Sequence, residues 1–250
     1  MTPVVSVITV CFNAARDLQK TIESVRKQSY NNIEYVIVDG GSQDGSRELI
    51  AASGDVVSKW VSRSDKGLYY AMNDGLDMAS GEYVLVLNAG DVFFECSTLE
   101  KIFSLSPSDM DIYYGDTMIC DSSGKSVGRR RLKLPVQLSA KSFRWGMSVC
   151  HQSVLIRRSI CSHYDTAYRI TADYDWVLSA IERADQNKIC NTGLFVSCFQ
   201  QGGLSSRHIK KANLERFVIM KKHYGLVQSL WFNFLMVFRL LFTYCKLGRI

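Results

Sequence analysis

Four short apolar runs alternate with segments of helical periodicity in roughly the first 90 residues, and this alternation constrains the fold more than any other feature. The runs are rich in Val, Ile and Leu and lie at residues 4–10, 33–38, 56–61 and 83–87. Continuous apolar runs of this length are typical of strands that are buried on both faces of a sheet. Each run is therefore predicted to be a strand.

Helices are expected between these strands. Leu18 and Ile22 recur at helical spacing, so residues 14–27 are predicted to form an amphipathic helix. A second helix is expected to begin near Ser46, and a third is expected over residues 67–78. Strands and helices that alternate with short connections predict an α/β fold, in which a mainly parallel central sheet is flanked by helices.

The alternation weakens after residue 92, although further elements are expected there. The predicted strands lie at 112–120, 126–131 and 154–156, and the predicted helices at 171–181, 209–224 and 227–246. The chain shows no internal repeat and no low-complexity linker. We therefore expect one α/β domain followed by C-terminal amphipathic helices.

The formal net charge of +6 hides an asymmetry between the two halves of the chain. Residues 1–124 contain 9 of the 30 Lys and Arg residues and 18 of the 24 Asp and Glu residues, and residues 125–250 contain the other 21 and 6. The first half thus carries a net charge of −9 and the second a net charge of +15. This split indicates two surfaces with different partners.

The cysteines and the N-terminus indicate the cellular compartment. The eight Cys residues are scattered without a C-x-x-C pair, which argues against a zinc site and against a disulfide framework. The first residues lack the charged segment and the long apolar core of a signal peptide. The sequence therefore favours a reduced, cytoplasmic protein.

Polar side chains cluster where the four predicted strands end. The members of this cluster are Thr9, Cys11, Asn13, Asp39, Ser42, Asp44, Ser64, Asp65, Lys66, Asn88 and Asp91, with Gly67 and Gly90 among them. Turn chemistry alone explains each of them, but the carboxyl ends of parallel strands converge, so four such ends favour one shared site. Carboxylates and amides suit the N–H groups of a base and the hydroxyls of a ribose, and a final Asp suits a divalent cation that also binds phosphate.

Three familiar enzyme motifs are absent. The turn after the first strand does not contain G-x-G-x-x-G, which argues against a dinucleotide-dependent dehydrogenase. The chain also lacks the phosphate-binding G-x-x-x-x-G-K-[ST] and the hydrolase motif G-x-S-x-G.

Five segments resemble the family 2 glycosyltransferases, in particular the bacterial enzymes that build surface polysaccharides. They read VSVITVCFNA, IEYVIVDGGSQDGS, SRSDKGLYYAMNDGLDMASGEYVLVLNAGD, SVCHQSVLIRR and ITADYDWVL. The resemblance implies the glycosyltransferase A (GT-A) fold, a nucleotide-diphospho-sugar donor, inversion at the anomeric carbon, and Mn²⁺ or Mg²⁺. It also implies a catalytic domain over residues 1–205, with a nucleotide-binding part at about 1–92 and an acceptor part at about 93–205.

The resemblance assigns roles to the polar residues at the strand ends. The residues that it places around the nucleotide-sugar are Thr9, Asn13, Asp39, Ser42, Asp65, Asn73 and Asn88. Asp91 corresponds to the last carboxylate of the family's Asp-x-Asp metal motif, whose first carboxylate is replaced here, since the segment reads Asn88-Ala89-Gly90-Asp91. Tyr70 stands where related enzymes commonly carry Asp.

Asp173 is the candidate catalytic base. Inverting transfer needs a base for the acceptor hydroxyl, and an Asp at the start of a helix is held ionised by backbone N–H groups. Such an Asp is also common for helix stability alone, so the assignment depends on the match of residues 172–175 to the family's base motif. Asp175 is the alternative, although it points around the helix from Asp173. His151 and Gln152 resemble a family pair between donor and acceptor, and residues 202–205 with Arg207 resemble a segment that closes over the diphosphate.

The basic half ends in residues 206–250, which are expected to associate with a membrane. Residues 207–222 hold six Lys or Arg residues and one Glu, and the last predicted helix is apolar around most of its circumference, with its polar residues on one stripe. This pattern is typical of a helix that lies in the membrane interface near anionic lipid. A buried core helix and a homodimer interface are the alternatives. No nucleic-acid-binding motif is present.

These observations lead to one main hypothesis and two alternatives. The main one is a metal-dependent inverting glycosyltransferase on the inner face of the cell membrane, which moves a sugar, with a UDP-sugar as the favoured donor, to a lipid-linked saccharide acceptor for cell-surface polysaccharide. The first alternative is a sugar-phosphate nucleotidyltransferase, although the Gly-rich basic loop typical of that class is missing after the first strand. The second is a non-catalytic nucleotide-sugar-binding subunit at the membrane.

Overall fold

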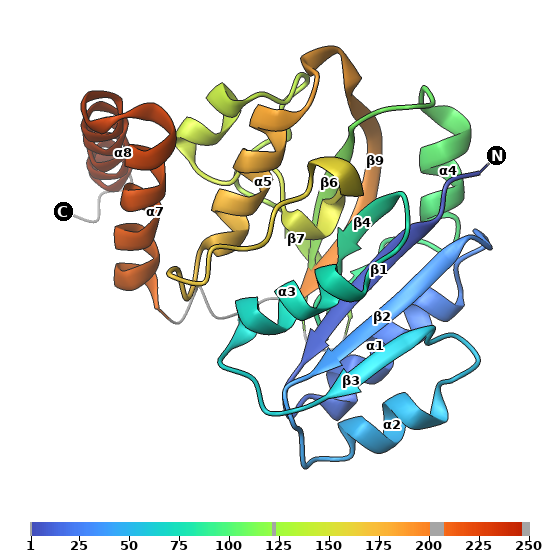
Figure 1. The fold of residues 1–250 in the computed structure, drawn as a ribbon. Coiled ribbons are helices and arrows are strands. Elements are labelled where there is room, and N and C mark those ends of the chain that lie inside the picture. The colour runs from blue at the N-terminus through green and yellow to red at the C-terminus, as the bar shows by residue number, and fades with distance from the viewer. Residues whose placement is uncertain (1, 122–123, 201–207, 247–250) are drawn as a thin grey trace.

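The computed structural model describes residues 2–121, 124–200 and 208–246 (Figure 1). Its strands are β1 (Val5–Cys11), β2 (Ile33–Asp39), β3 (Lys59–Ser62), β4 (Tyr83–Val86), β5 (Val92–Phe93), β6 (Ile112–Cys120), β7 (Ser126–Arg129), β8 (Val154–Arg157) and β9 (Ile189–Gln200). Its α-helices are α1 (Ala15–Arg26), α2 (Ser46–Ala52), α3 (Leu68–Met78), α4 (Thr98–Leu105), α5 (Ala172–Arg183), α7 (Ile209–Tyr224) and α8 (Leu226–Lys246).

Within these ranges the strands form one twisted sheet in the order β3-β2-β1-β4-β8-β6-β9-β5, and β7 pairs with the edge of β6. The first four strands in this order are parallel to one another. Strand β8 is antiparallel to both of its neighbours, and β6 and β9 are again parallel. The carboxyl ends of β1 to β4 therefore lie at one edge of the sheet, where the sequence predicted a site.

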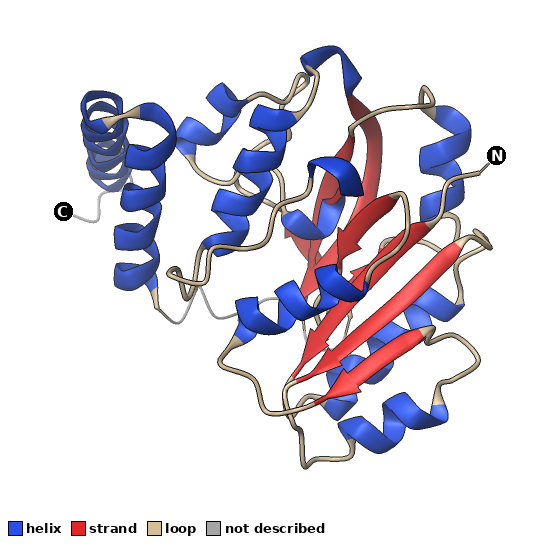
Figure 2. Ribbon diagram, in the orientation of Figure 1, coloured by secondary structure: helices blue, strands red, loops and turns tan. Residues whose placement is uncertain are grey.

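Helices cover both faces of the sheet, which gives three layers (Figure 2). All seven residues of β1 are buried, as a strand between two helical layers requires. On one face Leu18 and Ile22 of α1 pack with Leu99 of α4. On the other face Met72 of α3 packs in the same core as Trp176 of α5. The amphipathic periodicity of α1 and α3 thus orients these helices on the sheet.

The predicted α/β class is confirmed, and most predicted elements occur within a few residues of their expected bounds. Strands β5 and β9 and helix α4 were not predicted. β9 contains polar residues and Gly193, so it has no continuous apolar run to reveal it. Its position is fixed instead by its pairing with β6 and β5, which lie far away in the sequence.

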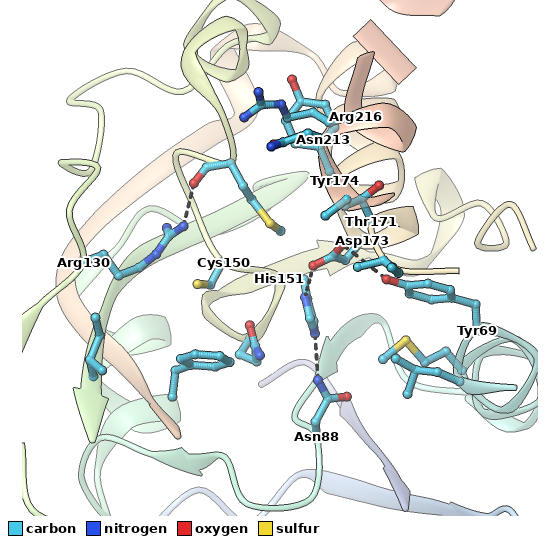
Figure 3. Close-up of a pocket in the computed structure, with 18 of the residues that line it drawn as sticks. Tyr69, Asn88, Arg130, Cys150, His151, Thr171, Asp173, Tyr174, Asn213 and Arg216 are labelled. Carbon is cyan, nitrogen blue, oxygen red and sulfur yellow. Dashed lines mark hydrogen bonds and ion pairs between the residues drawn. The ribbon is translucent and has the colours of Figure 1, made fainter. Parts of the chain in front are cut away.

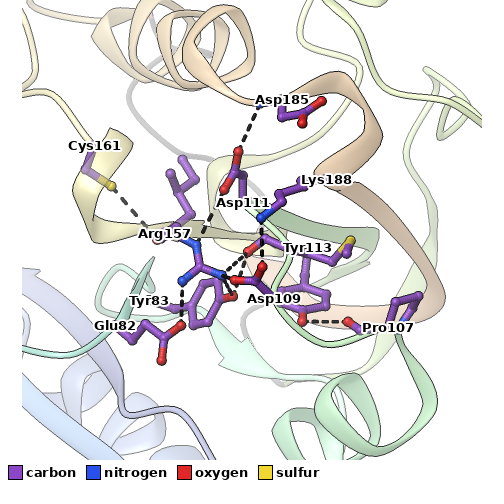
Figure 4. A network of polar contacts seen from close by, with 12 residues as sticks. Glu82, Tyr83, Pro107, Asp109, Asp111, Tyr113, Arg157, Cys161, Asp185 and Lys188 are labelled. Atoms are coloured by element: carbon purple, nitrogen blue, oxygen red, sulfur yellow. Dashed lines mark hydrogen bonds and ion pairs between the residues drawn. The ribbon is translucent and has the colours of Figure 1, made fainter.

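Arg157 fastens the junction between β4, β8 and β6 (Figure 4). Its guanidinium donates to Glu82 Oε1 at 2.6 Å and to Asp109 Oδ1 at 2.7 Å. It also donates to the Tyr83 hydroxyl at 2.8 Å and lies over the Tyr83 ring. Arg157 of β8 thus binds Glu82 and Tyr83 at the start of β4, and it also binds Asp109 in the segment before β6.

The two C-terminal helices lie beside α5, at the end of the molecule away from β3 (Figure 1). Phe232 of α8 packs edge-on against Trp145, and Arg144 lies over the Phe232 ring. In the described part of the chain, none of the helices combines the length and the apolar character that crossing a membrane would need.

Candidate active site

The loops after β1, β2 and β3 meet at Gly40. A Cβ atom on Gly40 would lie 2.8 Å from Asp65 Oδ2 and 3.3 Å from Phe12 Cδ2, so a larger residue at this position would displace these two side chains. The Phe12 side chain is 64% exposed, so one flat apolar face is open to solvent beside the Asp65 carboxylate. The predicted site residue Asp65 therefore lies at this junction. Phe12 was not predicted as a site residue, although its position directly after a buried strand, among polar residues, could have indicated it.

Asp39 is fully buried and organises the loop that follows β2. Its carboxylate accepts hydrogen bonds from the backbone N–H of Ser42 at 3.0 Å and from the hydroxyls of Ser42 and Ser62. Burial opposes the charged form of Asp39, but the hydrogen bonds from Ser42 and Ser62 outweigh it and lower the pKa of this carboxyl. Asp39 is thus an ionised anchor for the loop.

Asn13 and Ser42 join the first loop to the second. The backbone N–H of Asn13 donates to Ser42 Oγ at 2.7 Å, and Asn13 Oδ1 accepts from the backbone N–H of Gln43 at 2.9 Å. Asn13 has a φ of 47°, a left-handed conformation that Asn tolerates better than most residues. The structure therefore brings Asn13, Asp39, Ser42 and Asp65 together at one edge of the sheet.

Two other predicted nucleotide contacts are bonded to neighbouring segments of the protein. Thr9 is fully buried, and its hydroxyl donates to the Leu87 carbonyl at 2.7 Å and accepts from Tyr35 at 3.0 Å. Asn73 donates to the Tyr164 carbonyl at 3.0 Å and accepts from the Tyr164 N–H at 2.7 Å. Each side chain is engaged with neighbouring segments, so the structure gives both a structural role.

A cavity of about 470 Å³ lies beyond the end of β4, between α3, α5 and α7 (Figure 3). It is lined by Leu68, Tyr69, Met72, Asn88, Ile119, Arg130, Arg131, Met147, Cys150, His151, Gln152, Ile170, Thr171, Asp173, Tyr174, Phe199, Ala212, Asn213 and Arg216. Four of the predicted site residues, Asn88, His151, Gln152 and Asp173, are among them. The predicted closing segment and Arg207 lie outside the described residues.

Asn88, His151 and Asp173 form a hydrogen-bonded chain across this cavity (Figure 3). His151 Nδ1 lies 3.2 Å from Asp173 Oδ2, and His151 Nε2 lies 3.3 Å from Asn88 Nδ2. Because a carboxylate accepts, Nδ1 carries the imidazole proton and Nε2 accepts from the Asn88 amide. The Tyr69 hydroxyl lies 3.4 Å from Asp173 Oδ1. Asn88 Oδ1 is buried and has no hydrogen-bond partner among the described residues.

Asp91, the predicted metal ligand, is turned into the protein. Its carboxylate accepts from Gln152 Nε2 at 2.9 Å and from the backbone N–H of Gln200 at 3.1 Å. Burial raises the pKa of the Asp91 carboxyl to about 6, although these two donors act in the opposite direction. Gln152 thus lines the cavity and also holds Asp91 through its amide N–H.

These residues do not fit a divalent cation held by the protein alone. Asp91 is buried with both oxygens already bonded, and Asn88 supplies only an amide oxygen. Within residues 2–121, 124–200 and 208–246 no group of three or more His, Cys, Asp or Glu side chains is placed to hold a metal. The requirement for Mn²⁺ or Mg²⁺ stays a prediction, and no step below depends on it.

Helix α7 holds the start of α5, which carries Asp173. The Glu215 carboxylate accepts from the backbone N–H groups of Arg169, Ile170 and Thr171 at 3.0, 2.9 and 3.1 Å, and from the Thr171 hydroxyl at 3.2 Å. It thereby satisfies the backbone donors of the segment that leads directly into α5. The periodicity of α7 gave no sign of this contact, because Glu215 is a lone acid in a basic segment.

Asp175 fastens the other side of α5 to α7. Its carboxylate accepts from Lys222 Nζ at 3.0 Å and from His223 Nε2 at 2.8 Å. Burial opposes ionisation of Asp175, but His223 and Lys222 outweigh it and lower the pKa of the carboxyl. Asp175 is thus engaged in an ion pair, and Asp173 is the acid of this helix that lines the cavity.

The sequence profile described as Glycosyl transferase family 2 matches residues 6–165. The chain belongs to glycosyltransferase family 2. This family 2 enzyme is 26% identical over 233 residues to a PGL/p-HBAD biosynthesis glycosyltransferase of Mycobacterium bovis, with 86% of this chain and 84% of the relative covered. It is 32% identical over 187 residues to an uncharacterized glycosyltransferase of Mycobacterium tuberculosis, with 71% and 69% covered. The chain is therefore a glycosyltransferase, not the nucleotidyltransferase or non-catalytic subunit considered above.

Two solved structures share the fold of this family 2 enzyme. S. aureus TarS 1–349 in complex with UDP matches with a TM-score of 0.64 at 17% identity, and covers 87% of this chain. A mannosyltransferase from Pyrobaculum calidifontis in complex with GDP-Man and Mn²⁺ matches with a TM-score of 0.63 at 17% identity and 87% coverage. The chain spans 65% of the first and 64% of the second, which is less than two thirds of either. The expected GT-A fold is confirmed.

Proposed function

We propose that this enzyme transfers a sugar, with inversion, from a nucleotide-diphospho-sugar to a hydroxyl of a lipid-linked saccharide. The observation that carries the proposal is the hydrogen-bonded chain of Asn88, His151 and Asp173 across the cavity at the end of β4. It connects the strand-end edge, where a nucleotide would lie, to a carboxylate at the start of α5. TarS with UDP and the mannosyltransferase with GDP-Man support a nucleotide donor, since both share this fold.

The nucleoside would lie on the junction of the first three loops. The exposed ring of Phe12 offers a face for stacking by a base, and Asp65 Oδ2 lies beside it as a hydrogen-bond acceptor. Carboxylates accept from base N–H groups and from ribose hydroxyls. Asn13 and the buried Asp39–Ser42 pair keep the loops that carry these groups in place. A UDP-sugar stays the favoured donor.

Asp173 would act as the base. As the acceptor oxygen forms its bond to the anomeric carbon, the bond from that carbon to the diphosphate oxygen breaks and the hydroxyl proton passes to Asp173. Asp173 lies in the first turn of α5 and lines the cavity. His151 donates to Asp173 Oδ2 and so fixes the direction of the carboxylate. The base and the leaving group lie on opposite sides of the sugar. The acceptor oxygen therefore attacks the anomeric carbon from the face opposite the diphosphate, and the configuration is inverted.

The exposed apolar face of α8 supports membrane association. Val227, Leu230, Trp231, Phe234 and Phe238 are each between 53% and 81% exposed. Val227, Trp231, Phe234 and Phe238 are three or four residues apart and Leu230 lies beside them, so all five share one face of the helix, while Phe232 packs on the protein body. Large exposed apolar surfaces mark contact with a membrane or a partner. We place this face on the cytosolic leaflet, with the basic residues of α7 near anionic lipid.

Vesicle co-sedimentation tests the membrane contact. The full chain should sediment with vesicles that contain anionic lipid, and the double variant Trp231→Ser, Phe234→Ser should stay in the supernatant. A matched control is Leu105→Ser, which changes a similarly exposed apolar residue at the end of α4. Equal sedimentation of all three proteins would contradict the proposal. A concentration-dependent dimer that the double variant abolishes, without vesicle binding, would assign the face to a second copy of the chain.

The Asp173→Asn variant tests the transfer mechanism. Loss of the base should lower kcat by about 10²–10⁴-fold and leave the affinity for the nucleotide donor unchanged. The control Asp77→Asn removes an exposed carboxylate from α3 and should keep full activity. Full transfer by Asp173→Asn would show that Asp173 is not the base.

A further inference from the structure

The cavity contains a partly buried arginine that forms no ion pair with any residue that the structure describes. Arg216 projects from α7, and its Nε is buried without a hydrogen-bond partner among the described residues. Burial lowers the pKa of the Arg216 guanidinium, and only the nearby phenol of Tyr174 acts in the opposite direction. Partial burial of an unpaired guanidinium is costly, so this side chain is poised for an anion from outside the chain.

Two further arginines line the same cavity. Arg130 donates to the Ser148 carbonyl at 3.2 Å and to the Met147 carbonyl at 2.6 Å, so its guanidinium is held in one place (Figure 3). Arg131 lines the wall beside it. Asp173 is the one carboxylate among the lining residues that the structure describes, and it is already engaged with His151. The cavity therefore carries an excess of positive charge.

The arginine side of the cavity is separate from the donor side. In Figure 3, Asn88 lies at the end of β4, His151 and Asp173 lie above it, and Arg216 and Asn213 lie beyond Asp173. Glu215, the neighbour of Arg216, holds the start of α5, so Arg216 is fixed relative to Asp173. An anion at Arg216 would therefore lie on the acceptor side of the base.

We propose that Arg216 and Arg130 bind a phosphate or diphosphate group of the acceptor, and that this group places the acceptor hydroxyl at Asp173. The inference rests on the proposed function and adds a subsite to it. Guanidinium groups match phosphate oxygens with two parallel hydrogen bonds, which fixes direction as well as position. Asn213, one helical turn before Arg216, also lines the cavity and supplies a neutral donor on the same side of α7.

Binding of inorganic pyrophosphate in the presence of a nucleoside diphosphate tests the subsite. The donor site is first saturated with whichever of UDP, GDP, dTDP and CDP raises the melting temperature most, and pyrophosphate is then titrated by calorimetry. Pyrophosphate should still bind, and the Arg216→Met variant should weaken this binding by at least ~10-fold. The control Lys210→Met removes an exposed charge from the same helix and should leave the affinity unchanged.

Three results would overturn the proposal. The nucleoside diphosphate abolishes pyrophosphate binding, Arg216→Met binds pyrophosphate as tightly as the unaltered chain, or Lys210→Met weakens binding equally. If Arg216→Met does not fold, Arg130→Lys is measured in its place. This variant keeps the positive charge at residue 130 and removes the two parallel N–H donors of the guanidinium. Unchanged pyrophosphate binding by a folded Arg130→Lys variant would also overturn the proposal.

The source of the phosphate is identified by two further probes. Farnesyl diphosphate in detergent represents a lipid-linked acceptor, and glucose 1-phosphate represents a soluble sugar phosphate. Binding of either probe that Arg216→Met weakens supports the subsite. The probe that binds with the higher affinity identifies whether the phosphate belongs to a lipid-linked acceptor or to a soluble sugar phosphate. These binding measurements need no turnover, so they are independent of the Asp173→Asn test. If pyrophosphate binding does not depend on Arg216 but Asp173→Asn loses transfer, only the subsite is refuted. If binding depends on Arg216 but Asp173→Asn keeps full transfer, only the mechanism is refuted.

Discussion

Glu215 offers a sharp test of how the C-terminal helices support catalysis. Its carboxylate accepts four hydrogen bonds from residues 169–171, directly before the helix that carries Asp173. A hydrogen bond to a charged group contributes ~1.5–3 kcal/mol, but the four share one carboxylate and are not additive. Water can also replace part of them at exposed Arg169. We therefore expect Glu215→Ala to lower the free energy of unfolding by about 3 kcal/mol.

Thermal unfolding and steady-state kinetics measure the two consequences. For a chain of this size 1 kcal/mol corresponds to roughly 2–4 °C, so the melting temperature should fall by about 6–12 °C. Because Glu215 acts on the base through α5, kcat should fall while the donor KM stays the same. Glu215→Gln keeps an acceptor oxygen and should lose less in both assays. The control Glu48→Gln changes an exposed acid of α2 and should be neutral.

The reasoning on Glu215 is refuted by either of two outcomes. A melting temperature of Glu215→Ala equal to that of the unaltered chain would show that the hydrogen bonds to residues 169–171 contribute nothing. A fall in stability with an unchanged kcat, measured well below the new melting temperature, would show that the start of α5 needs no support from α7 to position Asp173.

Three other predictions follow from single side chains. The pKa of buried Asp91 is raised to about 6, so its contribution to stability is present at pH 4 and is lost as the pH rises through 6; Asp91→Asn should reduce the difference in melting temperature between pH 5 and pH 7, and an undiminished difference would assign it to other groups. Arg157→Met should lower the free energy of unfolding by about 1 kcal/mol in a urea titration, because its Glu82 and Asp109 partners are exposed and only buried Tyr83 loses a sheltered donor, and an unchanged free energy of unfolding would contradict the role of Arg157 in joining these two segments. Phe12→Ala should weaken binding of the preferred nucleoside diphosphate by about 5–100-fold in calorimetry, whereas Phe12→Tyr should not, and equal affinities would refute base stacking.

The order of strands and helices in the nucleotide-binding part could be predicted because it depends on local periodicity. The buried runs at β1, β2 and β4 and the apolar stripe of α1 are visible without any partner. The convergence of strand ends was also predictable, since parallel strands leave their carboxyl ends at one edge. Residue types at those ends and the match to known motifs then pointed to Asn88, His151 and Asp173.

Contacts between distant segments could not be read from periodicity. β9 lacks an apolar run and exists because β6 and β5 supply its hydrogen bonds. Asp91 was predicted to hold a metal, yet its carboxylate is buried and bonds to Gln152, which itself lines the cavity. A polar residue after a strand can turn toward the cavity or toward the core, and the choice depends on which donors lie within hydrogen-bond distance.

The sequence by itself determined the α/β class, the edge at which the site lies, and the acid at the start of α5. Only the tertiary structure decided which of the polar residues reach the cavity, and that α7 contributes Arg216 to it while Glu215 holds the segment before α5. The physical reason is one of range. Burial of an apolar stripe is set by the spacing of neighbours along the chain, whereas a carboxylate or guanidinium acts on whichever group the fold brings within about 3 Å of it.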